Sequence, residues 1–344
     1  MIGIIISTFE CNLSCQYCYE HSEANRVRTS RTTVNTTFAN NLNMCKEYVS
    51  CLSELAKMHG RSTQIILHGG EPLMIMPDNL ERLFERIRDN ENVAIQIQTN
   101  GTLITRKIAE MLHRYDVGVV ISVDGPQSIH DEYRKNAGRL NTFDMVIHAI
   151  DILRDKDVDV SALATITDVS SGRASDLFTF FSCLGIDFSV NRCFPVHGMS
   201  GGISEQLYRK FLSELFDLYY SVDLSHSRIR IPCFDRCIHD LKWNGNDYCY
   251  DSRISPYVSV FSIPEMKFEL ANRGQNKQFN SLSEYYSFLK LAINKETANS
   301  QIRLKGTLKD AVIEHLCRQQ ENDYLSALAA MGGSYEKSVY DTSV

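Results

Sequence analysis

The sequence predicts an α/β fold, a partial (β/α)6 TIM-like barrel followed by a smaller α+β extension. Three observations predict it. Through about residue 220, nearly continuous apolar runs suited to buried parallel strands alternate with helical patterns. Polar or glycine-rich motifs follow these runs, as expected where parallel barrel strands present their carboxyl ends to ligands. The hydrophobic fraction of 43% over 344 residues is sufficient for one large core.

Composition narrows the class of protein. The net charge of −6 gives no sign of a nucleic-acid partner. The first residues lack the charged and apolar regions of a signal peptide, and no apolar run approaches the about 18 residues that span a bilayer. Eleven cysteines in such a chain favour metal or redox chemistry over a disulfide framework. We therefore expect a cytoplasmic protein without a nucleic-acid or membrane partner.

Six strand–helix repeats account for the first part of the chain. We predict strands over residues 2–7, 63–68, 93–98, 117–123, 158–166 and 187–192. We predict helices over about residues 33–59, 77–90, 105–114, 141–155, 172–183 and 203–220. A change of composition near residue 225 then suggests three parts, which are a barrel at 1–222, an extension at 223–332 and a disordered polar tail at 333–344.

Three cysteines follow the first strand directly, Cys11, Cys15 and Cys18. Thiolates hold iron–sulfur clusters. Three of them on one loop leave one iron of a four-iron cluster without a protein ligand, as catalytic metal sites leave a position open. The same spacing also fits one buried face of a helix. The polar residues between the cysteines start helices poorly, so we favour a ligand loop.

The second and third strands end in glycine-containing motifs. After the second come Gly69, Gly70 and Glu71, then a proline. Paired glycines allow the backbone to approach a ligand closely, although a strand–helix turn could use them too. The third strand ends in Gln98-Thr-Asn100-Gly, where Asn-Gly is a turn signal by itself.

The fourth strand ends in Ser122-Val-Asp124-Gly-Pro, which would form a tight turn in any such fold. We expect the later His130 and Arg134 to be structural or to line the substrate, without choosing between these roles. The sixth strand ends in Asn-Arg192-Cys193, which would point toward the barrel mouth.

The cysteine spacing, with Tyr17 before the last cysteine, resembles that of the radical S-adenosylmethionine (radical SAM) superfamily, and the later motifs follow in the family's order. The resemblance implies a [4Fe-4S] cluster on Cys11, Cys15 and Cys18, with SAM on the fourth iron and a 5′-deoxyadenosyl radical that takes a hydrogen atom from the substrate. It also implies a set of SAM-binding residues, namely Gly69, Gly70, Glu71, Gln98, Asn100, Ser122 and Asp124. Arg192 could contact a peptide carbonyl or the SAM carboxylate, or form a salt bridge at the barrel end.

The run Ser-x-Asp-Gly-x5-Asp-x2-Arg resembles that of peptide-modifying radical SAM enzymes, near those that mature sulfatases. Residues after 225 resemble, in outline, the cysteine-rich SPASM extension of such enzymes, with a hairpin at 257–270 and a short helix at 280–286. Several positions depart from that pattern. Ala271 stands where the pattern has a cysteine, Asn272 stands where sulfatase-maturing enzymes have an acidic group, and no thiols follow Cys317, where Gln319 and Gln320 stand. We favour a degenerate scaffold without auxiliary clusters, and one auxiliary metal is the alternative, held by Cys233, Cys237, Cys249 and Cys317.

The resemblance implies a radical SAM enzyme that acts on a ribosomally made precursor peptide, with a flavodoxin- or ferredoxin-like reductant as partner. We favour an intrapeptide C–C or thioether cross-link. The alternatives are epimerisation at Cα, radical chemistry on a small molecule, and a non-enzymatic iron–sulfur module for electron transfer. Epimerisation needs a hydrogen-atom donor, for which the candidates are Cys193, Cys233, Cys237 and Cys249.

Overall fold

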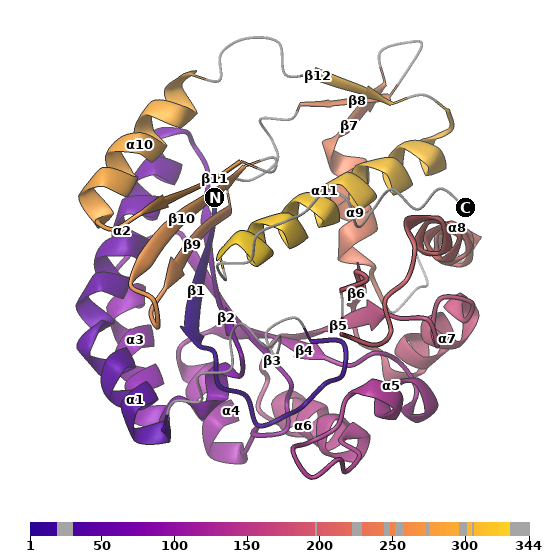
Figure 1. Ribbon diagram of the computed structural model, residues 1–344, viewed down its shortest axis with the longest axis horizontal. Coiled ribbons are helices and arrows are strands. Elements are labelled where there is room, and N and C mark those ends of the chain that lie inside the picture. Colours follow the sequence, from indigo (N-terminus) through magenta and orange to yellow (C-terminus); the bar gives the residue numbers. More distant parts are fainter. Residues whose placement is uncertain are drawn as a thin grey trace.

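Nine strands form the main sheet of the computed structural model, in the order β11-β10-β9-β1-β2-β3-β4-β5-β6. The structure describes residues 1–18, 30–196, 198–221, 229–243, 248–251, 258–272, 275–295, 301–304 and 306–330. Strands β1 to β6 are parallel and follow chain order, at Ile2–Thr8, Thr63–Gly69, Val93–Thr99, Val117–Ser122, Val160–Ile166 and Phe188–Arg192. They match the six predicted strands to within two residues. The sheet does not close, so the predicted partial barrel is confirmed (Figure 1).

Helices surround the outside of this curved sheet (Figure 1). They are α1 (Arg31–Asn40), α2 (Leu42–Met58), α3 (Pro77–Arg88), α4 (Arg106–Arg114), α5 (Gln127–Tyr133), α6 (Phe143–Asp155), α7 (Ala174–Leu184) and α8 (Glu205–Ser221), with a short 3-10 turn at Pro72–Met74. The prediction of one helix over 33–59 was wrong. The helix breaks at Asn41, whose side chain donates to Thr37 O (2.9 Å) and competes with the helical ladder. Helix α5 was not predicted.

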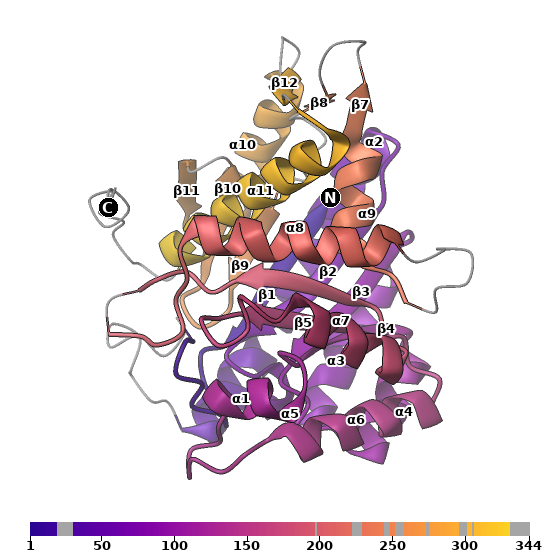
Figure 2. The same cartoon turned by 90° about the vertical axis from the view of Figure 1, so that its right-hand side faces the viewer.

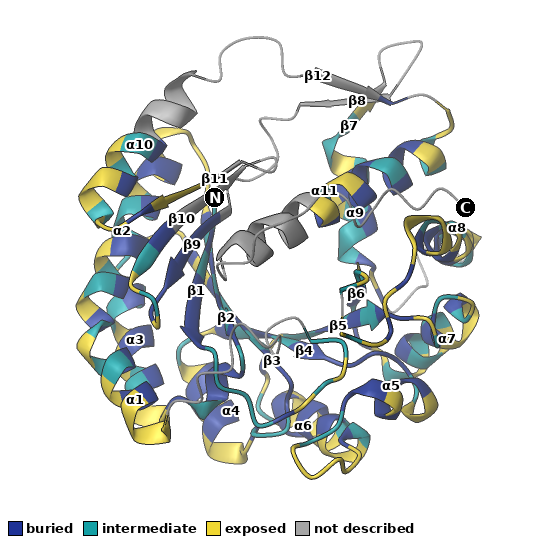
Figure 3. Ribbon diagram, viewed as in Figure 1, coloured by how far each residue is buried: buried dark blue, intermediate teal, exposed yellow. Residues whose placement is uncertain are grey.

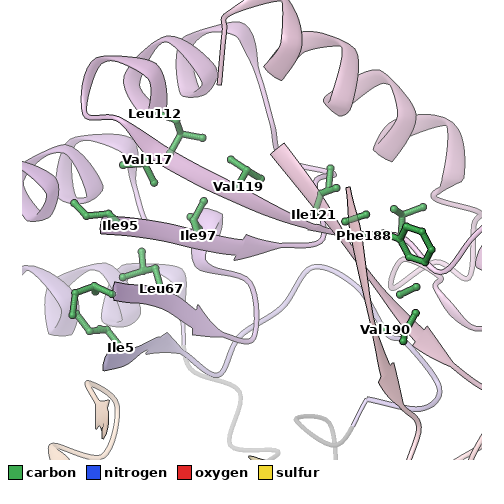
Figure 4. Close-up of a cluster of buried hydrophobic side chains, with 14 of the residues drawn as sticks. Ile5, Leu67, Ile95, Ile97, Leu112, Val117, Val119, Ile121, Phe188 and Val190 are labelled. Atoms are coloured by element: carbon green, nitrogen blue, oxygen red, sulfur yellow. The ribbon is translucent and has the colours of Figure 1, made fainter. Parts of the chain in front are cut away.

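Burial alternates along the strands, with one face covered and the other partly open. In β3, Ile95 and Ile97 are buried against the helices, whereas Gln96 and Gln98 on the opposite, concave face are only half-buried. The covered face forms the apolar layer in Figure 4, and the helices turn their exposed residues away from it (Figure 3). We had expected nearly continuous apolar strands, but the concave face of this open sheet keeps polar side chains because no helix of the outer ring packs on it.

The extension joins the same sheet at its β1 edge. Strand β9 (Val258–Ser262) runs parallel to β1, and β10 (Lys267–Asn272) and β11 (Gln275–Phe279) follow antiparallel. The predicted hairpin is therefore confirmed. Helix α10 (Leu282–Lys295) is longer than predicted and packs through Tyr285 onto Tyr48 of α2. The predicted boundary at 222/223 and the tail at 333–344 lie outside the described residues.

One helix of the extension crosses the open side of the sheet. Helix α11 (Leu308–Ala330) runs from the β9–β11 side to α8 and α9 (Pro232–Asp240) (Figures 1 and 2). A small second sheet contains β7 (Leu241–Trp243), β8 (Tyr248–Asp251) and β12 (Gln301–Leu304). In the described part of the chain, no helix has both the length and the apolar character needed to cross a bilayer.

Candidate functional site

The loop after β1 carries the three cysteines at the carboxyl edge of the parallel strands. Cys11, Cys15 and Cys18 are all partly accessible, and the loop is not helical. The alternative of a buried helix face is therefore wrong. The Cys11 sulfur accepts hydrogen bonds from Leu13 N (3.4 Å) and Asn100 Nδ2 (3.8 Å). Burial raises the pKa of the Cys11 thiol to about 12.

A buried ion pair anchors this loop to the end of β4. Tyr17 Oη donates to Asp124 Oδ2 (2.6 Å), and burial raises the pKa of Tyr17, so the phenol keeps the proton that it donates. Arg134 binds the same carboxylate in a bidentate manner (Nε–Oδ2 2.9 Å, Nη2–Oδ1 3.1 Å). Its guanidinium also lies 5.4 Å from the centre of the Tyr17 ring. Of the two roles left open for Arg134, the structure supports the structural one.

Asp124 has a further donor, Thr165 N at the end of β5 (2.9 Å to Oδ1). Its carboxylate is therefore engaged by three different groups of the protein. The predicted contact between this carboxylate and SAM stays a prediction, and the observed role of Asp124 is to hold the cysteine loop against two strand ends.

Main-chain hydrogen bonds hold the same loop from two further sides. Ser14 N donates to Lys135 O (2.8 Å) and Gln16 N donates to Tyr133 O (3.2 Å). On the other side, Ser200 N donates to Gln16 O (3.2 Å). Segments more than a hundred residues away in sequence thus fix the loop, and nothing local in the sequence indicated these contacts.

Glu71 lies fully buried under the loop. Its carboxylate accepts hydrogen bonds from Thr99 Oγ1 (2.7 Å), Leu73 N (2.9 Å) and Asn100 N (2.8 Å). Burial raises the pKa of Glu71, and these three donors oppose that shift. The carboxylate joins the end of β2 to the end of β3. Its predicted contact with the SAM amino group remains a prediction.

Gly69 and Gly70 allow the second strand to meet the cysteine loop. Gly69 has a φ of +123°, and a Cβ on it would lie 2.3 Å from Thr8 O. A Cβ on Gly70 would lie 2.3 Å from Glu10 O. Gly70 N donates to Thr8 O (2.7 Å). The sequence predicted a close approach of the backbone to a ligand. The structure shows a close approach of Gly69 and Gly70 to the main chain of residues 8–10, which leads into the cysteine loop.

Replacing Gly70 with alanine is expected to destabilise the protein by about 1–3 kcal/mol, because main-chain atoms cannot move aside for the new methyl group. Urea unfolding of the metal-free protein measures this. Gly172→Ala is the matched control, since a Cβ there meets nothing within 4 Å. Equal unfolding free energies for the two variants would contradict the close packing described.

Asn100 connects the end of β3 to the cysteine loop. Its Nδ2 donates to Asn12 Oδ1 (2.9 Å), and Asn12 Nδ2 donates to Thr102 Oγ1 (2.8 Å). Gln98 is half-buried on the concave face, and Ser122 is buried at the end of β4. The structure therefore places Gln98, Asn100 and Ser122, which we predict to line the cofactor, at the carboxyl ends of β3 and β4.

Arg192 binds the main chain of the loop that follows its strand. Its Nε and Nη2 donate to Ile203 O (3.0 and 2.8 Å), and its guanidinium lies 4.8 Å from the centre of the Phe194 ring. No salt bridge to Arg192 is found among the described residues. Its predicted contact with a peptide carbonyl or the SAM carboxylate stays a prediction. The side chain thus ties the end of β6 to Ile203, farther along the chain.

The candidate donor cysteines lie in different places. Cys193 is buried near the site, with Sγ 4.0 Å from Ser200 O. Burial, and to a smaller extent the charges of Asp124 and Asp168, raises the pKa of Cys193 to about 12. Cys237 on α9 lies fully buried in the core.

The other thiols of the extension form no site for a single metal ion in the described residues. Cys233 on α9 and Cys317 on α11 pack with Cys237 between the two helices and β6. The side chain of Cys249 lies outside the described part. Within that part, no three His, Cys, Asp or Glu side chains are arranged to hold a single metal ion. This result excludes a cluster neither on the cysteine loop nor on the extension, because each thiolate of a cluster binds a different iron.

His130 is buried behind Asp124. Its Nδ1 accepts from Asp124 N (3.4 Å) and its Nε2 lies 3.1 Å from Thr142 Oγ1. Burial lowers its pKa to about 4. The ring is therefore neutral at physiological pH and structural, which resolves the choice left open for it.

The lowered pKa of His130 predicts that the stability of the protein depends on pH. Between pH 6.5 and about 4 the unfolded chain binds a proton at His130 that the folded chain does not, so the free energy of unfolding falls as the pH falls. The loss is roughly 3 kcal/mol over that range. Urea unfolding from pH 7.5 to 4.5 measures it, and His130→Gln should reduce the slope. An unchanged slope in that variant would contradict the assignment.

Comparison with known proteins decides the family. The family model of the Radical SAM superfamily matches residues 5–170, which include the cysteine loop, the Gly69–Glu71 turn and the strand ends that hold them. Residues 5–170 of this chain form a radical SAM domain. Its three cysteines are suitable donors for an iron–sulfur cluster, and they stand at the strand edge where parallel barrels bind ligands.

Relatives of this radical SAM chain include two sulfatase-maturating enzymes. One, a "Cysteine-type anaerobic sulfatase-maturating enzyme" of Clostridium perfringens, is 28% identical over 70% of this chain and 65% of its own. The other, a "Serine-type" enzyme of Bacteroides thetaiotaomicron, is 28% identical over 68% of this chain and 60% of its own. The match thus spans less than two thirds of either relative.

A solved structure shares the fold of this radical SAM protein. The structure described as "Native anSMEcpe with bound AdoMet and Cp18Cys peptide" has a TM-score of 0.62 and 18% identity, and the match covers 96% of this chain and 99% of that one. At this identity the likeness shows the fold alone.

Sequence reasoning missed the residues that hold the cysteine loop in place. The motifs that contain Tyr17 and Arg134 indicate no partner for either residue. The spacing of Asp124 and Arg134 on either side of a short helix could have suggested their ion pair. No signal in the sequence indicated Ser200.

Proposed function

We propose that this chain is a radical SAM enzyme that modifies a ribosomally made peptide, with Cys11, Cys15 and Cys18 holding a [4Fe-4S] cluster to which SAM binds. When bound, the cluster and SAM supply a 5′-deoxyadenosyl radical that removes a hydrogen atom from the substrate. The observation that carries the proposal is the placement of the three accessible thiols at the carboxyl strand edge, held there by Tyr17 and Asp124.

The residues around the loop would keep the thiols in one arrangement. The bidentate pair of Asp124 and Arg134 is buried, so it holds Tyr17 in a region that water does not screen. Asn100 donates to the Cys11 sulfur and thus fixes the first thiol against β3. Precise positioning matters because the geometry of the bound substrate decides which hydrogen is removed.

The concave face carries side-chain amides that would suit a peptide substrate. Gln96 and Gln98 of β3 are half-buried on this face, and Gln98 is the residue before the carboxyl end of the strand. Side-chain amides carry both donors and acceptors, which suits the main chain of a peptide. The relatives named as sulfatase-maturating enzymes, and the solved neighbour with a bound peptide, support the same substrate class.

The extension favours a modification other than sulfatase maturation. At the position where sulfatase-maturing enzymes have an acidic group stands Asn272, an amide. Ala271 pairs with Val258, and Val258 pairs with Ile2, so this end of the hairpin lies beside the amino end of β1. The cysteine loop follows the other end of β1. We therefore propose an intrapeptide C–C or thioether cross-link.

Epimerisation at Cα is the second candidate, and one observation favours it. Cys193 is the donor candidate that lies close to Asp124 and the site, and its raised pKa keeps the hydrogen on sulfur at neutral pH. A hydrogen-atom donor must be a thiol, not a thiolate. Cys233 and Cys237 instead pack with α11 on the extension side.

Anaerobic reconstitution with iron, sulfide, dithionite and SAM tests the proposed chemistry. We expect 5′-deoxyadenosine to form. Its absence from a fully loaded protein would favour an iron–sulfur module over an enzyme. Co-expression with a short peptide encoded beside the gene, followed by mass spectrometry, separates a cross-link (loss of two hydrogens) from an epimer (no mass change). Turnover with a flavodoxin or ferredoxin in place of dithionite tests the proposed reductant.

A further inference from the structure

Strand β6 is an edge of the main sheet, and a side chain of α11 makes hydrogen bonds to the main chain on its free side. Gln320 is buried, and its Nε2 donates to Val190 O (2.6 Å). Its Oε1 accepts from Arg192 N (3.2 Å). An edge strand presents such main-chain groups on its free side, where Val190 O also accepts a hydrogen bond from Tyr208 Oη (3.2 Å). One side-chain amide therefore supplies to β6 the donor and the acceptor that another strand would supply.

The contact continues from β6 into the loop that follows it. We call residues 193–196 and 198–203 the β6 loop. The Arg192 guanidinium binds Ile203 O, and Ile203 N donates to Cys193 O (3.0 Å). These contacts tie both ends of the β6 loop to Arg192, the last residue of β6. The main-chain N–H of Arg192 is the group that donates to Gln320.

The β6 loop in turn lies against the candidate site. Ser200 N donates to Gln16 O of the cysteine loop (3.2 Å). Gly201 has a φ of +81°, and a Cβ on it would lie 3.2 Å from the Tyr133 ring and 3.2 Å from Thr167. Asp168 N donates to Gly201 O (3.1 Å). The β6 loop is thus packed between the end of β5 and the loop that carries the three thiols.

We propose that Gln320 is a positioning residue for the active site, which fixes the β6 edge and, through Arg192 and the β6 loop, one side of the cysteine loop. This inference rests on the proposed function only for its catalytic consequence. Gln320 lies in the stretch after Cys317 where the SPASM-like pattern would have further thiols. There the side-chain amide of Gln320 joins the extension to the barrel by its hydrogen bonds to the main chain of β6. No part of the proposal requires Gln320 to touch substrate or cofactor.

Hydrogen–deuterium exchange of the full-length, metal-free protein tests the proposal without relying on activity. We compare Gln320→Ala and the similarly sized Gln320→Met with Gln319→Ala, which changes the neighbouring, partly exposed glutamine. Both Gln320 variants should speed exchange in the β6 loop and in residues 11–18 by about tenfold, the effect of losing one to two hydrogen bonds. Gln319→Ala should leave both segments unchanged.

A third variant separates positioning from general loss of stability. In Gln320→Glu the carboxylate can accept from Arg192 N but cannot donate to Val190 O. Relative to the wild type at each pH, its excess exchange in the β6 loop should fall as the pH is lowered and the introduced carboxyl gains a proton. A general destabilisation would instead speed exchange throughout the sheet.

Two outcomes would overturn the inference. One is faster exchange in α11 alone for Gln320→Met, with the β6 loop and residues 11–18 unchanged. The other is a uniform increase in all strands. Formation of 5′-deoxyadenosine by the wild type is scored separately, so a failure of the proposed enzymatic function and a failure of this inference give different results.

Discussion

Replacing Cys15 with alanine is expected to abolish the iron–sulfur absorbance of the reconstituted protein and, with it, the formation of 5′-deoxyadenosine. Cys11→Ala and Cys18→Ala should have the same effect, because a cluster with two protein thiolates lacks the ligands that hold three of its irons. Iron analysis and anaerobic absorption spectra measure the first loss, and chromatography of the quenched reaction measures the second.

Cys183→Ala is the matched control for these variants. Cys183 is exposed on α7, outside the cysteine loop. Its replacement should leave iron content and SAM cleavage as in the wild type. Retention of a full cluster by Cys15→Ala would show that other thiols hold the iron and would refute the assigned ligand set.

Removing Arg134 is expected to have the largest effect on stability. Arg134→Ala leaves the buried Asp124 carboxylate without its cationic partner, which typically costs about 3–5 kcal/mol. It also removes the cation that lies against the Tyr17 ring, so the cysteine loop should lose iron faster than in the wild type. Urea unfolding of the metal-free protein and iron release to a chelator measure the two effects.

An exposed ion pair provides the comparison. Arg173 and Asp176 form a salt bridge in which both side chains are well exposed, so Arg173→Ala should change the unfolding free energy by less than about 1 kcal/mol. If Arg134→Ala were no more destabilising than Arg173→Ala, the buried pair would not be the anchor of the loop.

The sequence allowed the barrel and the thiols to be predicted because their signals are local. Each strand could be recognised from its own apolar run, and the cysteine loop from spacing within eight residues. The break at Asn41 was missed because both halves of the helix have helical patterns, and a side-chain hydrogen bond decides the break. The position of Arg192 at a strand end could be predicted, but its contact with Ile203 could not, because Ile203 lies on a loop that returns to the strand.

The long-range contacts could not be predicted from the same signals. Pairing of β9 with β1 joins residues more than 250 positions apart, and the hairpin pattern does not say which edge it joins. The contact of Gln320 with Val190 depends on where α11 crosses the open sheet. Such contacts follow from the packing of whole elements, and a buried glutamine in a helix gives no sign of its partner.

The most direct test of the central claim is electron–nuclear double resonance of the reduced, reconstituted protein with SAM isotopically labelled in its amino and carboxylate groups. If three protein thiolates hold the cluster and SAM binds the remaining iron, the labelled atoms should show hyperfine coupling to the cluster, and the coupling should be absent in Cys15→Ala. A reduced four-iron cluster that shows no coupling to labelled SAM would contradict the account.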